Sequence, residues 1–280
     1  MKVFKNISEL KDVLFKERSA GKSVGFVPTM GALHKGHVSL VEKAVGENNT
    51  VVVSIFVNPT QFNDKTDLKN YPRTPEKDIK LLEKAGAHYI FMPDEHEMYP
   101  EPDTRLFNFG LLEKVMEGAH RPGHFNGVAQ VVSKLFYIVE PHRAYFGQKD
   151  FQQLAIIRQL VKQLNLAVEI ISCPIVREPD GLAMSSRNLL LEPEVREAAP
   201  IIYKTLAEAS GKMNSLTVNE LTEWVEENIN KNPYLSVEYF SLADSSTLQP
   251  VEKWSDSSSI IGCIAVKAGK IRLIDNAFFK

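Results

Sequence analysis

The sequence predicts an α/β protein with a Rossmann-like, doubly wound parallel sheet and a smaller C-terminal α+β domain. In the first half of the chain, short apolar runs alternate with amphipathic helical segments, which is the pattern of repeated βαβ units. Polar turns that contain glycine follow several of these runs. In the last third, helical segments come first and strand-like segments follow. We expect the domains to be residues 1–176 and 177–280.

The expected elements of the first domain alternate in regular order. Apolar residues at helical spacing precede each strand-like run, so helices connect the strands and parallel pairing is favoured. The predicted helices are 10–15, 37–44, 78–87, 127–141 and 150–165, and the predicted strands are 24–27, 51–59, 88–93, 143–150 with its loop, and 167–176.

The second domain is expected to begin near 177–182, where Pro179 and Gly181 interrupt the pattern. A pocket between the two domains is the expected place for a ligand. The predicted helices here are 192–210 and 217–232, and the predicted strands are 235–244, 259–269 and 270–275.

Composition and charge narrow the class of function. The chain has 33 Lys+Arg against 35 Asp+Glu, so it lacks the positive charge that long nucleic acid or an anionic membrane surface attracts. No run reaches the roughly 18 to 20 apolar residues of a membrane span, and the N-terminal segment lacks the apolar core of a secretory signal. Cys173 and Cys263 lie far apart in apolar surroundings, which predicts buried thiols. We expect a cytoplasmic protein that acts on small molecules.

The segment 25–40, GFVPTMGALHKGHVSL, carries the first candidate site. Gly31 and Gly36 have the spacing of a phosphate-binding P-loop, but His37 stands where that motif has Lys, which weakens a P-loop NTPase. A turn from a strand into a helix still favours an anion, and His34 and His37 are suited to donate hydrogen bonds to phosphate oxygens. The alternative is that two histidines near a helix start are only surface polarity; a zinc site is less favoured because no Cys lies nearby.

Two further polar segments follow predicted strands. Asn58 and Gln61 come after the buried run 51–57, and their amides suit the hydroxyl and amide groups of a small substrate, although turn chemistry alone explains Asn58. In YFGQKDFQQL, Lys149 is suited to bind phosphate, and Asp150 is either a ligand or a helix N-cap.

Two loops complete the candidate residues. In DGLAMSSRNLLL, Ser185, Ser186 and Arg187 supply donors for a polyphosphate, or else form a helix start or a linker. In EGAHRPGHFNGV, Arg121 and His124 lie in a loop that is either a binding loop or a structural turn.

Taken together, the segments PTMGALHKGH, FVNPTQF, YPRT, RPGHFNGV, GQKDFQQ and GLAMSSRN resemble the pantoate-β-alanine ligase (pantothenate synthetase) family, a member of the wider H-x-G-H nucleotidylyltransferase group. All six occur in the family's order and spacing. Residues 190–280 resemble the family in general layout only. Gln130 stands where the family pattern has a hydroxyl residue.

The resemblance implies an ATP-dependent ligase that condenses (R)-pantoate with β-alanine through a pantoyl adenylate and releases AMP and pyrophosphate. It implies Mg²⁺ with ATP, no organic cofactor and a homodimer. It implies catalytic roles for His34, His37, Lys149 and Arg187, with His37 as proton donor. The implied ATP-binding residues are Met30, Gly31, Ala32, Leu33, His34, Lys35, Gly36, His37, Gly147, Gln148, Lys149, Asp150, Val176, Met184, Ser185, Ser186 and Arg187.

The same resemblance implies that Gln61 and Gln153 bind pantoate, with Gln61 also near β-alanine. Asn58 joins these substrate-binding residues because of its place after a strand, and Asp78, after YPRT, is a candidate Mg²⁺ ligand. The loop 180–187 and the second domain are expected to close as a lid over the reactive adenylate. Two alternatives remain. One is a nucleotidylyltransferase of the H-x-G-H group that leaves its nucleotide on another small acid or phosphate, and the other is a nucleotide-sensing module without turnover.

Overall fold

The computed structural model describes all 280 residues, which form two compact units. The first unit consists of Met1–Phe109, Arg121–Gln148 and Ile156–Pro174. The second consists of Gly110–His120, Lys149–Ala155 and Ile175–Lys280. The chain passes between the units several times, and the single domain boundary expected after residue 176 stays a prediction.

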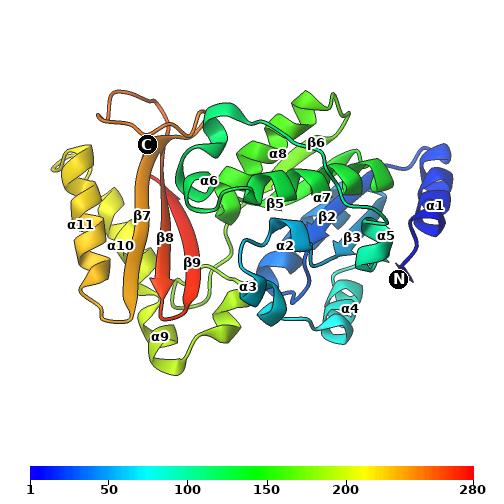
Figure 1. Ribbon diagram of the computed structural model, residues 1–280, viewed down its shortest axis with the longest axis horizontal. Coiled ribbons are helices and arrows are strands. Elements are labelled where there is room, and N and C mark those ends of the chain that lie inside the picture. The colour runs from blue at the N-terminus through cyan, green and yellow to red at the C-terminus, as the bar shows by residue number, and fades with distance from the viewer. The chain divides into compact units, whose positions relative to one another are not determined.

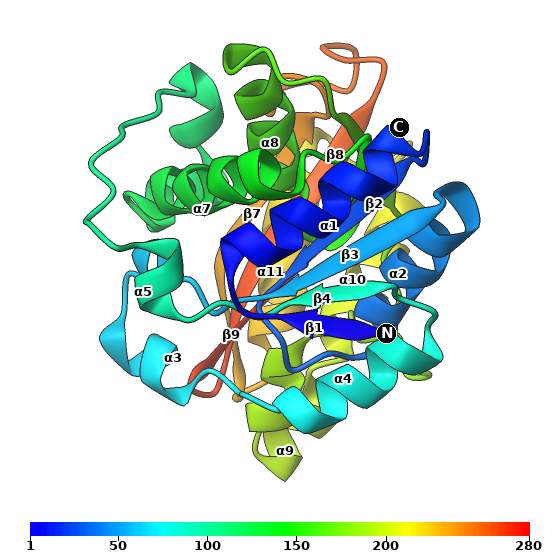
Figure 2. The same cartoon turned by 90° about the vertical axis from the view of Figure 1, so that its right-hand side faces the viewer.

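The first unit is built on a six-stranded parallel sheet with the order β1-β4-β3-β2-β5-β6 (Figure 2). The predicted fold class is therefore confirmed. The sequence pattern missed β1, because three residues are too few to show a period. The strands are β1 (Lys2–Phe4), β2 (Val24–Thr29), β3 (Thr50–Ile55), β4 (Tyr89–Phe91), β5 (Arg143–Gly147) and β6 (Glu169–Cys173).

Helices cover both faces of this sheet (Figure 2). On one face, Phe26 of β2 packs edge-to-face on Phe136 of α7. On the other face, Val27 of β2 joins Val41 of α2 and Leu82 of α4 in a buried apolar cluster. The helices of this unit are α1 (Ile7–Ser19), α2 (Lys35–Glu47), α3 (Lys65–Asn70), α4 (Pro75–Lys84), α5 (Glu95–Met98) and α7 (His124–Val139), with a short 3-10 helix, η1 (Pro59–Gln61).

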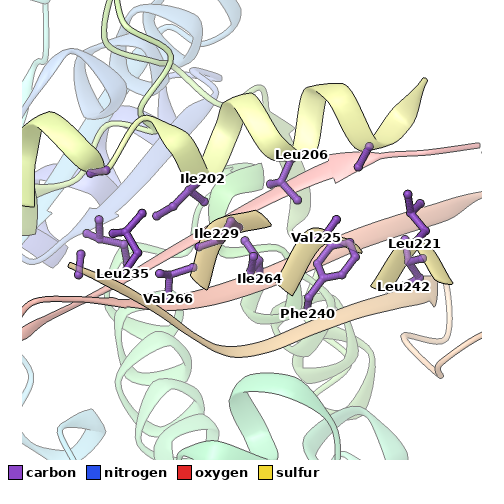
Figure 3. Packing of buried hydrophobic residues seen from close by; sticks show 14 of the residues in the cluster. Ile202, Leu206, Leu221, Val225, Ile229, Leu235, Phe240, Leu242, Ile264 and Val266 are labelled. Atoms are coloured by element: carbon purple, nitrogen blue, oxygen red, sulfur yellow. The ribbon is translucent and has the colours of Figure 1, made fainter. Parts of the chain in front are cut away.

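The second unit has an antiparallel sheet of three strands, β7 (Leu235–Asp244), β8 (Ile260–Ala268) and β9 (Ile271–Phe278). Figure 1 shows its helices α10 (Ile201–Ser210) and α11 (Val218–Asn230) beside these strands. Leu206 and Ile229 of the two helices lie in one buried cluster with Ile264 of β8 (Figure 3). This core explains why α10 and α11 carry apolar residues at helical spacing.

The predicted helix 192–210 is two helices in the structure, α9 (Pro193–Ala198) and α10. The break falls at Ala199 and Pro200, because a proline has no backbone N–H to continue a helix and crowds the residue before it. Three further elements are α6 (Met116–His120), α8 (Phe151–Gln163) and a 3-10 helix, η2 (Gly110–Glu113). The second unit contains α6, η2 and the start of α8, and the first unit contains the rest of α8.

Both cysteines are buried and unpaired with each other, as predicted. No helix combines the length and the apolar character that crossing a bilayer requires.

Candidate functional site

The strand order of the first unit identifies the edge of the sheet where a ligand is expected. From β2 the chain moves outward through β3 and β4, and then returns to place β5 on the other side of β2. In open parallel sheets ligands bind outside the carboxyl ends of the strands at such a switch point. The chain leaves β2 at Thr29 and β5 at Gly147, so the predicted segments 30–37 and 147–148 both begin there.

The turn that follows β2 has a backbone conformation that few residues adopt. Gly31 has a φ of +82° and Ala32 one of +50°, both in the left-handed region. A Cβ on Gly31 would also lie 3.1 Å from an oxygen of Asp78. Thr29 stabilises the turn, because its hydroxyl accepts the Gly31 N–H and donates to the Ser54 carbonyl.

Asp78 of α4 holds this turn in place. Its two carboxylate oxygens accept the N–H groups of Ala32 and Leu33 at 2.9 and 2.8 Å, and the Thr74 hydroxyl donates to it as well. The residue is only 1% exposed. A carboxylate buried against three protein donors differs from a ligand to a hydrated Mg²⁺, which keeps several waters. In this structure both carboxylate oxygens position the turn, and the expected role of Asp78 as a Mg²⁺ ligand stays a prediction.

His34 and His37 begin α2 as a reciprocal capping box. The Nδ1 atom of His34 accepts the Gly36 N–H at 3.1 Å, and the Nδ1 atom of His37 lies 3.4 Å from the His34 N–H. The helix start predicted here is thus confirmed. A neutral imidazole that accepts at Nδ1 carries its proton on Nε2. The backbone therefore specifies two Nε2–H donors, with ring centroids 4.1 Å apart, at the positive end of a helix.

Asn58 and Gln61 have different surroundings. Asn58 is 1% exposed, and its amide nitrogen donates to Thr60 Oγ1, Gly127 O and Gln61 Oε1. Its oxygen accepts the Tyr99 hydroxyl at 2.8 Å, and burial raises the pKa of Tyr99 to about 12, so the hydroxyl stays protonated. These contacts make Asn58 a support for Gln61, and its expected role as a substrate contact stays a prediction.

Gln61 is half-buried, and its amide nitrogen lies 3.4 Å from the sulfur of Met30. The structure therefore brings together two predicted residues, one from the turn after β2 and one from η1. The presence of Gln130 also has a structural explanation, because its amide donates to the carbonyls of Asp103 and Arg105 beside α7.

In the second unit, residues 176–184 form a tight hairpin. Met184 N–H donates to the Val176 carbonyl, and Arg177 pairs with Ala183 as an antiparallel bridge. Gly181 turns the chain with a φ of +96°, and a Cβ there would lie 2.7 Å from the Tyr203 ring. The candidate residues Ser185, Ser186 and Arg187 directly follow this hairpin. The Ser185 hydroxyl accepts the Arg187 N–H and caps the 3-10 helix Ser186–Leu190.

A buried ion pair supports this hairpin. Arg177 makes two hydrogen bonds to the carboxylate of Asp275 in β9, at 2.6 and 3.0 Å, and lies 3.6 Å from the centre of the Tyr203 ring. Burial raises the pKa of Asp275, and the Arg177 guanidinium opposes that shift. The next residue, Asn276, donates to the carbonyl of Lys149 at 2.9 Å. One strand therefore supports two candidate ATP-binding segments.

Sequence reasoning missed Arg177 and Asp275 as parts of the site. An acidic residue, Asp275, at the end of a strand-like run was the available signal, but nothing in local spacing identifies a partner 98 residues away.

The candidate residues of the second unit also include Lys149, Asp150 and Gln153. Lys149 Nζ lies 3.7 Å from Asp150 Oδ2, and the Asp150 side chain is 45% exposed. Gln152 is buried and donates to the carbonyls of Leu112 and Val115, whereas Gln153 is partly exposed. Of the two glutamines, Gln153 is therefore the one suited to contact a ligand.

The candidate residues divide between the two units. Residues 30–37, 58, 61, 78 and 147–148 lie in the first, and residues 149–153, 176 and 184–187 lie in the second. No group of three or more His, Cys, Asp or Glu side chains forms a metal site.

Comparisons with known proteins agree over the whole chain. The family model described as Pantoate-beta-alanine ligase matches residues 2–278. Among curated proteins, the pantothenate synthetase of Porphyromonas gingivalis (strain W83) is 54% identical over 99% of this chain and 98% of its own, and that of Bacteroides fragilis (strain YCH46) is 56% identical over 100% and 99%.

Two solved structures are similar as well. The pantothenate synthetase of Thermus thermophilus has a TM-score of 0.92 at 44% identity and covers 99% of each chain. The pantoate-beta-alanine ligase of Francisella tularensis, solved in complex with beta-gamma ATP and beta-alanine, has a TM-score of 0.83 at 37% identity and covers 100% of this chain and 98% of its own.

Proposed function

The chain belongs to the pantoate-beta-alanine ligase family, and we propose that it condenses (R)-pantoate with β-alanine, using ATP, to form pantothenate. The observation that carries the proposal is the H-x-G-H turn at the switch point of the sheet. Backbone groups there hold His34 and His37 as Nε2–H donors at the N-terminus of α2.

In the first step, an oxygen of the pantoate carboxylate attacks the α-phosphorus of ATP. The bond from that phosphorus to the bridging oxygen breaks, and pyrophosphate leaves. His34 and His37 donate to phosphate oxygens, and those bonds strengthen as negative charge moves onto the leaving pyrophosphate. The cationic side chains of Lys149 and Arg187 neutralise phosphate charge, and residues 184–187 close over the β- and γ-phosphates.

In the second step, the amine of β-alanine attacks the acyl carbon of the pantoyl adenylate. The bond from this carbon to the phosphate oxygen breaks, AMP leaves, and the new amide loses one proton. Gln61 and Gln153 hold pantoate, with Gln61 also near the amine. Positioning and electrostatics supply the catalysis, and no protein nucleophile is needed. Accordingly, burial raises the pKa of the Cys173 thiol to about 11 and that of Cys263 to about 12, so neither is a ready thiolate.

The remaining parts of the proposal concern the surroundings of the reaction. Mg²⁺ enters bound to ATP, the protein works as a homodimer in the cytoplasm, and the loop 180–187 closes over the adenylate to exclude water. Equal protease sensitivity of that loop with and without ATP plus pantoate would contradict the closure.

A pyrophosphate-release assay tests the function directly. We expect release with ATP and pantoate, none without pantoate, and AMP release only when β-alanine is added. A stable nucleotidylated product would instead indicate a nucleotidylyltransferase. ATP binding without any turnover would indicate a nucleotide sensor.

A further inference from the structure

His124 begins α7 and is only 6% exposed. Its Nδ1 atom lies 2.8 Å from the carbonyl oxygen of Gln61, and its Nε2 atom lies 3.2 Å from Nη1 of Arg121. A guanidinium has no acceptor, so Nε2 must accept from Arg121, and a carbonyl has no proton, so Nδ1 must donate to Gln61. The two partners therefore specify the Nδ1–H tautomer, which is the opposite of the one that His34 and His37 adopt.

The segment that receives this hydrogen bond already packs tightly against α7. A Cβ on Gly127 would lie 2.3 Å from the carbonyl oxygen of Thr60, so the helix backbone and the η1 backbone are in direct contact. Asn58 adds a hydrogen bond to the Gly127 carbonyl. These contacts locate the start of η1, and the His124 bond determines the orientation of the peptide that follows Gln61.

We propose that His124, with its tautomer set by Arg121, is a positioning residue for Gln61 in pantoate binding. The proposal rests on the proposed function, in which the Gln61 amide holds pantoate. Without this hydrogen bond the backbone at Gln61 loses an anchor to α7, so the end of η1 can shift and the Gln61 amide can leave its place beside Met30. The effect falls on pantoate and not on ATP.

Two amide variants separate the two ring nitrogens. In His124→Asn the amide nitrogen stands where Nδ1 stood and can still donate to the Gln61 carbonyl. In His124→Gln the polar atoms stand near Nε2, so the contact with Arg121 survives and the bond to Gln61 is lost. We expect His124→Gln to raise the KM for pantoate about tenfold, the factor for one hydrogen bond, and His124→Asn to stay within about threefold of the wild type. The KM for ATP should be unchanged in both.

Several outcomes decide the proposal. An unchanged pantoate KM in His124→Gln overturns it. Equal losses in both variants, or a parallel rise in the KM for ATP, would mean that His124 only fills space, and thermal melting of both variants identifies any general loss of folding. A wild-type protein with no pantoate-dependent pyrophosphate release contradicts the proposed function itself. Independently of turnover, the ¹⁵N shifts of the His124 ring should show the proton on Nδ1, and a proton on Nε2 would refute the assignment.

Discussion

The two units stabilise their folds with different kinds of polar contact. In the first unit, imidazoles accept backbone N–H groups at Nδ1. His34 does so from Gly36 at the start of α2, whereas His88 does so from Val51 and His142 from Val24, near the starts of β3 and β2. In the second unit, buried ion pairs connect separate elements. Arg177 pairs with Asp275, and Arg272 pairs with Glu117 and Glu238.

The difference predicts different responses to perturbation. A neutral imidazole contributes about one hydrogen bond, and its removal has a modest cost. A buried ion pair contributes little to the free energy of unfolding compared with an apolar pair. The removal of one partner, however, leaves an uncompensated buried charge and lowers that free energy strongly. The first unit should therefore weaken gradually, and the second should fail at a single position.

The largest expected effect is that of Asp275→Ala, which leaves Arg177 without its carboxylate. We expect the free energy of unfolding of the second unit to fall by about 3 to 5 kcal/mol, measured by urea denaturation. The KM for ATP should rise more than that for pantoate, because Lys149 and the 176–184 hairpin lose their support.

The matched control is Arg196→Ala, which breaks the Arg196–Asp180 pair, whose side chains are 33% and 38% exposed. Such a pair is worth less than about 1 kcal/mol. If Asp275→Ala and Arg196→Ala lose similar amounts of unfolding free energy, the contrast between buried and exposed ion pairs is wrong.

The next effect is on turnover and separates capping from catalysis in the first unit. In His34→Asn the side-chain oxygen can accept the Gly36 N–H as Nδ1 does, since Asn is a favoured N-cap. The Nε2–H donor is lost. We expect stability within about 0.5 kcal/mol of the wild type and turnover reduced about 10² to 10³-fold, with ATP affinity nearly spared. Turnover near the wild-type rate would reduce His34 to a helix cap.

These contrasts also show what the sequence was able to predict. Local periodicity predicted the strands and helices that surround the site, and the turn residues predicted a helix start near His34 and His37, where α2 begins. Patterns of this kind describe what lies within a few residues along the chain.

The supporting contacts are of another kind. Asp78 accepts a hydrogen bond from Ala32, which is 46 residues away in the sequence, and Arg177 pairs with Asp275, which is 98 residues away. An acidic residue that follows YPRT suggests a metal ligand when only its type is known, and only its buried partners identify it as a backbone acceptor. For the same reason the type of Asn58 suggests a substrate contact, whereas its amide is enclosed by Thr60, Gly127 and Tyr99.

A third variant tests whether Asp78 positions the turn or binds Mg²⁺. Asp78→Ala leaves the N–H groups of Ala32 and Leu33 without their acceptor, and we expect a loss of about 1 to 3 kcal/mol and faster amide exchange at both residues. Asp78→Asn retains one oxygen acceptor, so its loss of unfolding free energy should lie between zero and that of Asp78→Ala. The concentration of Mg²⁺ needed for half-maximal turnover should not change in Asp78→Asn. A large increase in that concentration would instead support Asp78 as a magnesium ligand.

The smallest expected effect concerns pH and the neutral imidazoles of the first unit. Desolvation by burial lowers the pKa of His88 below the usual 6.5, although the residue as a whole is exposed. The unfolded chain therefore binds this proton at a higher pH than the folded one, so the stabilisation is complete above about pH 6.5 and is lost as the pH falls through the folded value. In His88→Asn an oxygen can accept the Val51 N–H and does not titrate. The difference in unfolding free energy between wild type and variant should change by about 0.5 kcal/mol or less between pH 7 and pH 5, with the wild type losing more. A wild type that gained stability relative to His88→Asn on acidification would show that this imidazole is held as a cation, and the contrast between the two units would then fail at His88.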